Sequence, residues 1–430
     1  MKSHICIFWF RRDLRLEDNI GLSAALASGT PVLPLFIFDS DILDDLPSPY
    51  DRRVDYIHQA LQQIDNALAD HGSALMIRQG RVVEIFSSLL TEYTVEAVYC
   101  NRDYEPQAIA RDAAIRQLLQ HHDIDFRDFK DQVIFEKGEI CKNDGSPYTV
   151  YSPYARKWRA QLAIQSLEPK NYDPPRYVQR VTELPSLAEL GFEKTDLVFG
   201  PPSLDEHLIA TYGQYRDYPA LEHSSMLGIA LRFGTISIRR CVASAREKEE
   251  SWLAQLIWRE FFMQILYHFP HVVDQAFKPQ YDRIEWRNDV NDFKRWCAGE
   301  TGYPLVDAGM RQLQQTGFMH NRVRMVAASF LCKHLLIDWR WGEAYFAEKL
   351  NDYELASNNG NWQWAAGSGC DAAPYFRIFN PETQLKKFDD AKSYVKKWIP
   401  DYSEAHYLPP MVDHAYARQR ALSYYQAALR

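Results

Sequence analysis

The apolar residues of this 430-residue chain form short strand-like runs before about residue 130 and follow helical spacing beyond residue 204, which limits the folds it can adopt. Between residues 4 and 130, short apolar runs alternate with amphipathic segments. Four of these runs are typical of buried strands: Ile5 to Phe10, Val32 to Phe38, Ala74 to Ile77 and Val95 to Cys100. Strands that alternate with helices form parallel sheets with helices on both faces. The first part of the chain is therefore predicted to be an α/β domain with a doubly wound parallel sheet.

One helix of this region is predicted in more detail, because its apolar residues recur at spacings of three and four. They are Val54, Ile57, Leu61, Ile64 and Leu68. These residues form one helix face, and Gly72 stands where a C-terminal cap belongs. No GxGxxG follows the first strand, so a flavin or nucleotide would not be held by the usual dinucleotide fingerprint.

Beyond residue 204 the strand signals fade and helical periodicity dominates, and nine of the eleven tryptophans lie there. Six prolines between residues 165 and 205 indicate a long irregular connection. We therefore predict three regions. They are an α/β domain over 1–130, an inter-domain connection over 131–203 and an all-α domain over 204–430.

Charge and cysteine content exclude several classes of protein. A formal net charge of −8 argues against a protein that coats nucleic acid by bulk attraction. The seven cysteines are widely spaced and none stands in a CxxC, which favours reduced thiols and argues against a zinc site or other metal centre. No run approaches the roughly 18 apolar residues of a membrane helix. We expect a cytoplasmic protein without a membrane segment.

Four separate blocks, in order along the chain, carry a family resemblance. They are Trp9 to Asn19, Arg216 to Ser237, Leu256 to Ala308 and Met319 to Pro381. Together they resemble the DNA photolyase and cryptochrome family, and most closely its cyclobutane pyrimidine dimer photolyases. The resemblance implies an N-terminal α/β domain and a helical domain that binds FAD. It also implies light-driven repair of UV-damaged DNA by a monomer that needs no obligate protein partner.

The resemblance implies a flavin site around Asn358, which would face flavin N5. A neutral amide can form a hydrogen bond with N5 without readily supplying a proton, which helps to keep the ring as the reduced anion. Arg324 and Asp352 are expected to form a salt bridge beside the ring, because a buried charge needs a partner. Glu354 occupies a position where the family often has Asp. Asn359 is expected in a turn, since Asn and Gly normally mark turns.

The phosphates and ribityl chain of FAD would lie near two serines. Short hydroxyls and loop N–H groups near a helix start can bind an anion, although either serine could instead be a helix N-cap. His223 and Gly228 depart from the family pattern here. The expected FAD contacts are Tyr212, Ser224, Ser225, Leu227, Gly228, Trp252, Arg259, Arg324, Asp352, Glu354 and Asn358.

Three tryptophans, Trp362, Trp339 and Trp296, resemble the family's chain of indoles that carries electrons between the flavin and the surface. Trp296 has charged neighbours in the sequence, which predicts that it is the surface end. Ordinary core packing is the alternative for each of them. With Asn358 and Gln255, these three complete the expected catalytic residues.

The expected substrate pocket would receive a pyrimidine dimer flipped out of DNA. Asn321 and Met325 are spaced i, i+4, and Gln255 and Trp258 are spaced i, i+3, so each pair should share a helix face. With Trp364 they match the walls of this pocket. Expected DNA contacts around it, which position the duplex without reading sequence, are Arg216, Arg322, Arg377 and Gln384.

The pocket also bears on the choice between subfamilies. Dimer photolyases normally have Glu at the position of Gln255. Six-four photolyases have Gln there, but they place paired histidines around the position of Asn321, where this chain has only His320. DASH-type cryptochromes usually have Tyr at the position of Trp364. A six-four photolyase, a cryptochrome-type blue-light receptor and a dark flavin oxidoreductase remain as alternatives.

Many relatives bind a second, light-harvesting chromophore. Glu105 resembles a folate-contacting carboxylate, and it could equally be an acidic residue at a helix N-terminus. A methenyltetrahydrofolate, a deazaflavin, a second flavin or no antenna all stay open.

Overall fold

The computed structural model describes residues 4–430. The chain forms two compact units, and each consists of several segments of the sequence. One unit comprises Met1–Glu139, Leu162–Leu204 and Leu227–Glu247. The other comprises Ile140–Gln161, Asp205–Met226 and Lys248–Arg430. We call them the α/β unit and the helical unit.

A five-stranded parallel sheet forms the centre of the α/β unit, in the order β3-β2-β1-β4-β5. The strands are β1 (His4–Phe10), β2 (Val32–Asp39), β3 (Met76–Gly80), β4 (Thr94–Asn101) and β5 (Asp125–Phe129). The predicted fold class and its first four strands are confirmed. β5 was not predicted, because its residues Asp-Phe-Arg-Asp-Phe contain no apolar run and little of this strand is buried.

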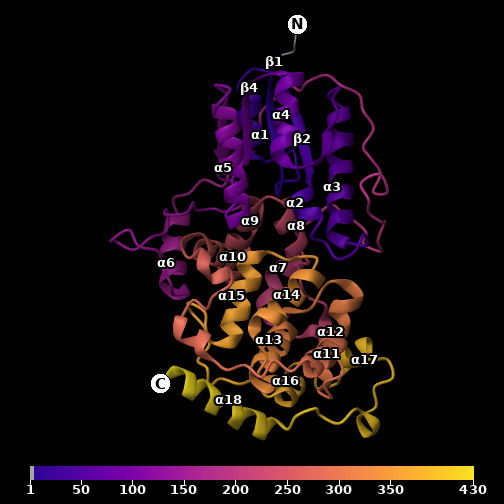
Figure 1. Ribbon diagram of the computed structural model, residues 1–430, viewed down its shortest axis with the longest axis vertical. Coiled ribbons are helices and arrows are strands. Elements are labelled where there is room, and N and C mark those ends of the chain that lie inside the picture. Colours follow the sequence, from indigo (N-terminus) through magenta and orange to yellow (C-terminus); the bar gives the residue numbers. More distant parts are fainter. Residues whose placement is uncertain (1–3) are drawn as a thin grey trace. The chain divides into compact units, whose positions relative to one another are not determined.

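Helices cover both faces of this sheet (Figure 1). Phe8 and Phe10 of β1 pack against α1 (Ile20–Leu26) and α3 (Arg52–Ala69). Ile7 and Trp9 point to the other face, where α4 (Val82–Glu92) and α5 (Pro106–Gln120) lie. Successive side chains of a strand point to opposite faces, so a strand buried on both faces is a continuous apolar run. Gly72 follows α3 with φ +67°, and its N–H donates to the Ala69 carbonyl, which confirms the predicted cap.

The remaining α-helices have the following bounds. They are α2 (Ser40–Leu43), α6 (Tyr151–Leu162), α7 (Glu206–Tyr215), α8 (Gly228–Phe233), α9 (Ile238–Lys248), α10 (Glu250–His268), α11 (Val290–Ala298), α12 (Pro304–Thr316), α13 (Asn321–Ser329), α14 (Trp339–Lys349), α15 (Leu355–Ala366), α16 (Pro381–Phe388), α17 (Ser393–Trp398) and α18 (His414–Leu429). Within residues 4–430, no helix is both long enough and apolar enough to span a bilayer.

Helix α15 lies at the centre of the helical unit, where it packs against α10, α13 and α14. Two glycines permit this close packing. A Cβ at Gly360 of α15 would overlap the Phe262 ring of α10, and a Cβ at Gly342 of α14 would overlap the indole of Trp362. Asn359, expected in a turn, instead lies inside α15, where its amide donates to the Val272 carbonyl at 2.7 Å. The tertiary hydrogen bond offsets the weak helix propensity of Asn.

Candidate active site

A cavity of about 610 Å³, including its part open to solvent, lies between α13, α14 and α15 in the helical unit. It brings together residues that the sequence analysis assigned to two different roles. The predicted site residues that line it are Asn321, Arg324, Met325, Asp352, Glu354, Asn358, Trp362 and Trp364. Flavin binding and dimer binding stay predictions for these residues, but the structure brings all of them together in one cavity.

Arg324 and Asp352 form the predicted salt bridge at the wall of this cavity. Nη2 of Arg324 lies 2.9 and 3.1 Å from the two carboxylate oxygens of Asp352. Nε of the same guanidinium donates to the Met319 carbonyl at 2.7 Å. The guanidinium is therefore fixed by two partners, and its charge is balanced where it faces the cavity.

Glu354 is held by a second ion pair. Its carboxylate accepts from Nη2 of Arg259 on α10 at 3.1 Å and from the Ser357 hydroxyl at 3.2 Å. Both Glu354 and Arg259 are mostly buried. Breaking such a pair by removing one partner leaves an uncompensated charge, which costs about 3–5 kcal/mol when burial is complete. The pair links α10 to the start of α15 and so stabilises the helix that carries Asn358.

Asn358 is oriented by a residue that the sequence analysis missed. Its Nδ2 donates to Glu343 of α14 twice, to Oε1 at 2.8 Å and to the backbone carbonyl at 3.0 Å. The Oδ1 oxygen of the amide is therefore the atom left to face the cavity. Burial raises the pKa of Glu343 above its ordinary value, although the Asn358 hydrogen bond lowers it. Glu343 lies four residues after Trp339, and nothing in this local pattern distinguishes it from a solvated helix residue.

The predicted electron path is only partly supported by the positions of its tryptophans. Trp362 and Trp296 lie edge to face with ring centroids 6.2 Å apart, and Trp339 is buried in the same core. The prediction that Trp296 is the surface end is wrong, because its side chain is 0% exposed. The charged neighbours Lys294 and Arg295 lie on the other side of the short amphipathic helix α11, so they say nothing about the exposure of Trp296.

The substrate-pocket residues fall into two groups. Nδ2 of Asn321 lies 3.9 Å from Sδ of Met325, which confirms that these two share one face of α13. Trp364 lines the same cavity. Gln255 and Trp258 lie on α10 and do not line it. The Gln255 amide donates to the Ser251 carbonyl at 3.3 Å.

Trp258 has one face covered by Tyr151 of α6, a contact that the sequence analysis missed. The two rings stack with centroids 3.7 Å apart and an interplanar angle of 5°. The Tyr151 hydroxyl donates to the Ala254 carbonyl at 3.0 Å. Any base that stacks on Trp258 is therefore restricted to the opposite face of the indole.

The expected DNA contacts differ in how available they are. Arg322 is mostly buried, pairs with Asp217 at 2.7 Å and lies 4.3 Å from the Phe388 ring centroid. Arg216 packs over Tyr212 at 5.1 Å. Arg377 is exposed, whereas Oε1 of Gln384 on α16 is buried and has no hydrogen-bond partner. Arg377 is thus the expected contact that is ready to bind a phosphate without rearrangement.

The other expected FAD contacts do not line the cavity that holds Asn358. Tyr212, Ser224 and Ser225 belong to the helical unit, as does the buried Trp252 of α10. Leu227 and Gly228 belong to the α/β unit. Leu227 is the N-cap of α8, so neither serine is the N-cap and this alternative is wrong. The Ser224 hydroxyl lies 3.3 Å from Sδ of Met226.

His320 precedes Asn321 and acts as the N-cap of α13. Its Nδ1 accepts from the Arg322 N–H at 3.2 Å, so the ring is neutral at this nitrogen. Burial, with a smaller effect of Arg324, lowers the pKa of His320 to about 4. A buried, neutral cap of this kind is a poor proton donor, in contrast to the paired histidines of a six-four site.

The cap makes stability depend on pH. The pKa of His320 lies below its ordinary value of 6.5 in the folded state, so folded protein loses stability as pH falls below 6.5 towards 4. At pH 5 the expected loss is on the order of 2 kcal/mol. Urea unfolding at pH 7 and pH 5 measures it, with His320→Asn as the matched variant, because Asn caps without titrating. An equal loss of unfolding free energy in both proteins would mean that His320 does not cause the pH dependence.

A second cavity, of about 1860 Å³ including its part open to solvent, lies in the α/β unit at the carboxyl ends of the strands, where open α/β sheets bind ligands. Trp9 forms part of its wall, and the Arg111 guanidinium lies 5.0 Å from the Trp9 ring centroid. Glu105 is the N-cap of α5 but makes no capping hydrogen bond. Its carboxylate instead pairs with Arg12 at 2.9 Å and Arg232 at 2.6 Å.

Comparison with known proteins identifies the family. Residues 6–175 match the DNA photolyase family, and residues 252–406 match the FAD binding domain of DNA photolyase. The deoxyribodipyrimidine photo-lyase of Synechococcus sp. is 38% identical, with 93% of this chain and 88% of that protein covered. The enzyme of the same name from Halobacterium salinarum is 36% identical over 98% of this chain and 99% of its own.

A solved structure agrees with these sequence matches. The archaeal photolyase of Sulfolobus tokodaii, described with two FAD molecules, superimposes with a TM-score of 0.88. It is 34% identical, and 98% of this chain and 100% of that chain are covered. The matched FAD-binding region, residues 252–406, contains the whole cavity that holds Asn358 and Trp364. The chain therefore belongs to the DNA photolyase family, with FAD as its cofactor.

Proposed function

We propose that this protein repairs UV-damaged DNA with light, by splitting a flipped-out cyclobutane pyrimidine dimer. The observation that carries the proposal is the shared cavity. Residues expected to hold the flavin, such as Asn358 and Arg324, line the same space as Asn321 and Trp364, which are expected to hold the dimer. An electron donor and its acceptor would therefore lie close together. The relatives named deoxyribodipyrimidine photo-lyase support the same reaction.

The polar groups around the cavity fit a flavin ring, whose edges carry hydrogen-bond donors and acceptors. FAD, when bound in its reduced form and excited by light, supplies the electron that opens the cyclobutane ring. Asn358 presents an acceptor oxygen, because its amide nitrogen is held by Glu343. Arg324 presents a positive charge that Asp352 balances. The Arg259–Glu354 pair keeps α15 in position.

The dimer would be bound between Trp364 and the Asn321–Met325 face of α13. Flipping a damaged base costs a few kcal/mol, and stacking on an aromatic ring returns about 1–3 kcal/mol per base. Arg377 would hold a phosphate beside the pocket. The neighbouring Phe376 is 59% exposed, which suits an apolar side chain that inserts where a base step has been disrupted.

The path that returns FAD to its reduced state starts at Trp362 and needs a surface end other than Trp296. We propose Trp286 for this end, after Trp339. Trp286 is partly exposed, and the segment that follows it runs beside the segment that precedes Trp339. The Arg287 N–H donates to the Leu336 carbonyl at 2.8 Å, and the Asp338 N–H donates to Oδ1 of Asn288 at 2.8 Å.

Gln255 is the position where the repair yield can be tested. Gln255 does not line the cavity, but it matches the family position whose carboxyl group contacts the dimer. If a bound dimer reaches α10, Gln255→Glu should raise the quantum yield of splitting, because a carboxyl group can donate a stronger hydrogen bond to the developing radical anion. Single-flash repair of prereduced enzyme measures this yield. Gln280→Glu is the matched control, since Gln280 is exposed in a short 3-10 helix of the same unit, Pro279–Arg283. An unchanged yield in Gln255→Glu would mean that this position does not control splitting.

The experiment that tests the proposed function separates the two lesion classes. One duplex carries a cyclobutane thymine dimer and a second carries a six-four lesion, each with reduced enzyme under blue light. Because His320 is a buried helix cap rather than an acid, we expect repair of the cyclobutane dimer only. Repair of the six-four lesion alone would replace the proposal with its nearest alternative.

The cavity of the α/β unit supports a further proposal, that this chain holds a light-harvesting chromophore there. The archaeal structure, described with two FAD molecules and a novel light-harvesting cofactor, supports a second flavin. A folate held by Glu105 is less favoured, because two arginines already pair with that carboxylate. Extraction of the purified protein and chromatography of its chromophores test this, with a flavin in excess over one per chain as the expected result.

A further inference from the structure

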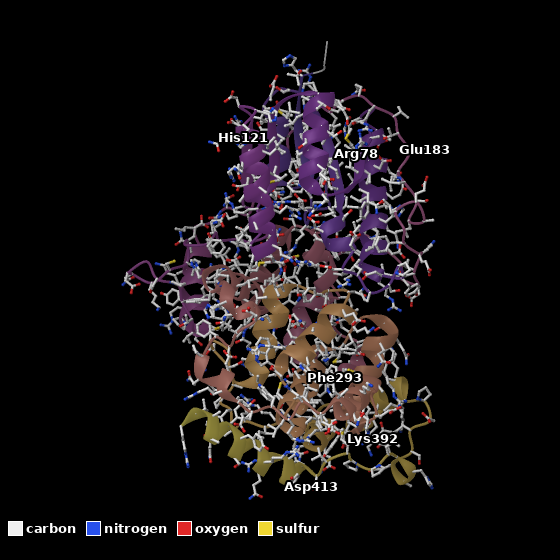
Figure 2. All side chains as sticks on the ribbon, viewed as in Figure 1. Arg78, His121, Glu183, Phe293, Lys392 and Asp413 are labelled. Carbon is white, nitrogen blue, oxygen red and sulfur yellow. The ribbon has the colours of Figure 1, made fainter. Side chains whose placement is uncertain are left out.

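Trp296 has no role in the path through Trp339 and Trp286, yet it lies beside Trp362. Within residues 4–430, four aromatic rings contact it: Phe293, Tyr345, Phe346 and Trp362. Phe293, labelled in Figure 2, and Phe346 are not readily oxidised. Tyr345 and Trp362 are readily oxidised, and their ring centroids lie 5.8 and 6.2 Å from that of Trp296. Trp296 therefore connects two oxidisable rings at nearly equal distances.

The surroundings of Trp296 suit an electron relay rather than an end point. The ring is fully enclosed, and its Nε1–H donates to the Ala327 carbonyl at 3.2 Å. A backbone carbonyl is too weak a base to take the proton, and water does not reach the ring. An oxidised Trp296 would therefore keep its proton and remain a strong oxidant until an electron arrives from a neighbour.

Tyr345 of α14 is such a neighbour, and it reaches the surface. The side chain is partly buried, and its hydroxyl accepts from the exposed Gln314 amide at 3.3 Å and faces the Cys297 carbonyl at 3.5 Å. Burial raises the pKa of Tyr345 to about 12, so the ring is a neutral phenol at pH 7. Its proton is lost when the ring is oxidised, and the hydroxyl lies where solvent can take that proton.

We infer that Trp296 and Tyr345 form a second branch of the electron path, from Trp362 to the surface. This inference rests on the proposed photoreduction of FAD. Trp362 gives one electron to the light-excited, oxidised flavin, and Trp296 then gives one electron to Trp362. Tyr345 gives one electron to Trp296 and one proton to water, which leaves a neutral Tyr345 radical. A thiol in solution reduces this radical by one electron and one proton, so the protein returns to its initial state.

The test measures photoreduction without DNA, in the FAD-loaded protein with a thiol present. Trp339→Phe blocks the first branch and exposes the second. We expect this variant to retain part of its photoreduction and to show a tyrosyl radical by electron paramagnetic resonance. Adding Tyr345→Phe should remove the tyrosyl signal and lower photoreduction to the level of Trp362→Phe. Deuterated water should slow the second branch, because a phenolic proton is released.

Matched variants separate the branch from unrelated effects. Tyr402→Phe in the Trp339→Phe background is the control, since Tyr402 lies in the same unit and contacts Tyr407 rather than Trp296. Tyr345→Trp should restore photoreduction and replace the tyrosyl signal by a tryptophanyl one. FAD absorption and the melting temperature report folding of each variant.

Two results would overturn the inference. One is complete loss of photoreduction in Trp339→Phe, and the other is a tyrosyl signal that persists after Tyr345→Phe. The absence of lesion repair would instead overturn the proposed function. It would leave these spectroscopic results unchanged, because they involve no DNA.

Discussion

Trp362→Phe is expected to abolish the reduction of bound FAD by light. Trp362 lines the cavity, and both proposed branches begin at this ring, one through Trp339 and one through Trp296. Phenylalanine keeps most of the packing against Phe346 but cannot be oxidised by the flavin. Bleaching of the oxidised flavin band under blue light, with a thiol present, measures the effect.

Trp398→Phe is the matched control for this loss. Trp398 is a partly buried indole of the same core, at the end of α17, and it does not line the cavity. In the Trp398→Phe variant, light should reduce the bound FAD as it does in the unchanged protein. When FAD is reduced chemically beforehand, Trp362→Phe should still repair DNA, because the electron used in repair passes to the dimer and not through this ring. Normal photoreduction in Trp362→Phe would refute the path.

The second large effect is expected on binding of the lesion. Trp364→Ala should weaken the affinity for DNA with a cyclobutane dimer by about 1–3 kcal/mol, or roughly 5- to 150-fold in Kd. The indole lines the cavity beside Asn321 and Met325, where a flipped base would stack. Titration of a fluorescent duplex with and without one dimer measures both affinities under the same salt conditions.

The control for this variant is the undamaged duplex, whose affinity should change little. Contacts to phosphates, such as that expected of the exposed Arg377, do not depend on the lesion. Arg377→Ala should therefore weaken both duplexes alike. Equal losses on damaged and undamaged DNA in Trp364→Ala would mean that the indole does not contact the flipped dimer.

Local patterns predicted the elements whose cause is local. The strands β1 to β4 are continuous apolar runs because both faces of the sheet are covered. The helix with Val54 and Leu68 on its buried face ends at Ala69, and Gly72 follows it in the left-handed conformation that terminates helices. The Arg324–Asp352 bridge was predicted because the family resemblance places both residues beside the flavin, where opposite charges need each other.

Features caused by distant segments could not be predicted in this way. The run around Asn359 resembles a turn, but it is helical because its amides bond to the segment near Val272. Glu343 orients Asn358 from another helix, and Tyr151 covers Trp258 from a segment more than a hundred residues away. The error at Trp296 has the same origin, because charged neighbours in sequence lie on a different face of α11.

Light-dependent repair of a single defined lesion is the decisive experiment for this protein. The substrate is an oligonucleotide with one thymine cyclobutane dimer, mixed with protein whose FAD has been reduced beforehand. One sample is kept under blue light and a matched sample in darkness. Light-driven dimer splitting by this protein should give intact thymines in the illuminated sample alone. Absence of repair in the light, with FAD bound and reduced, would contradict it, and so would equal repair in darkness.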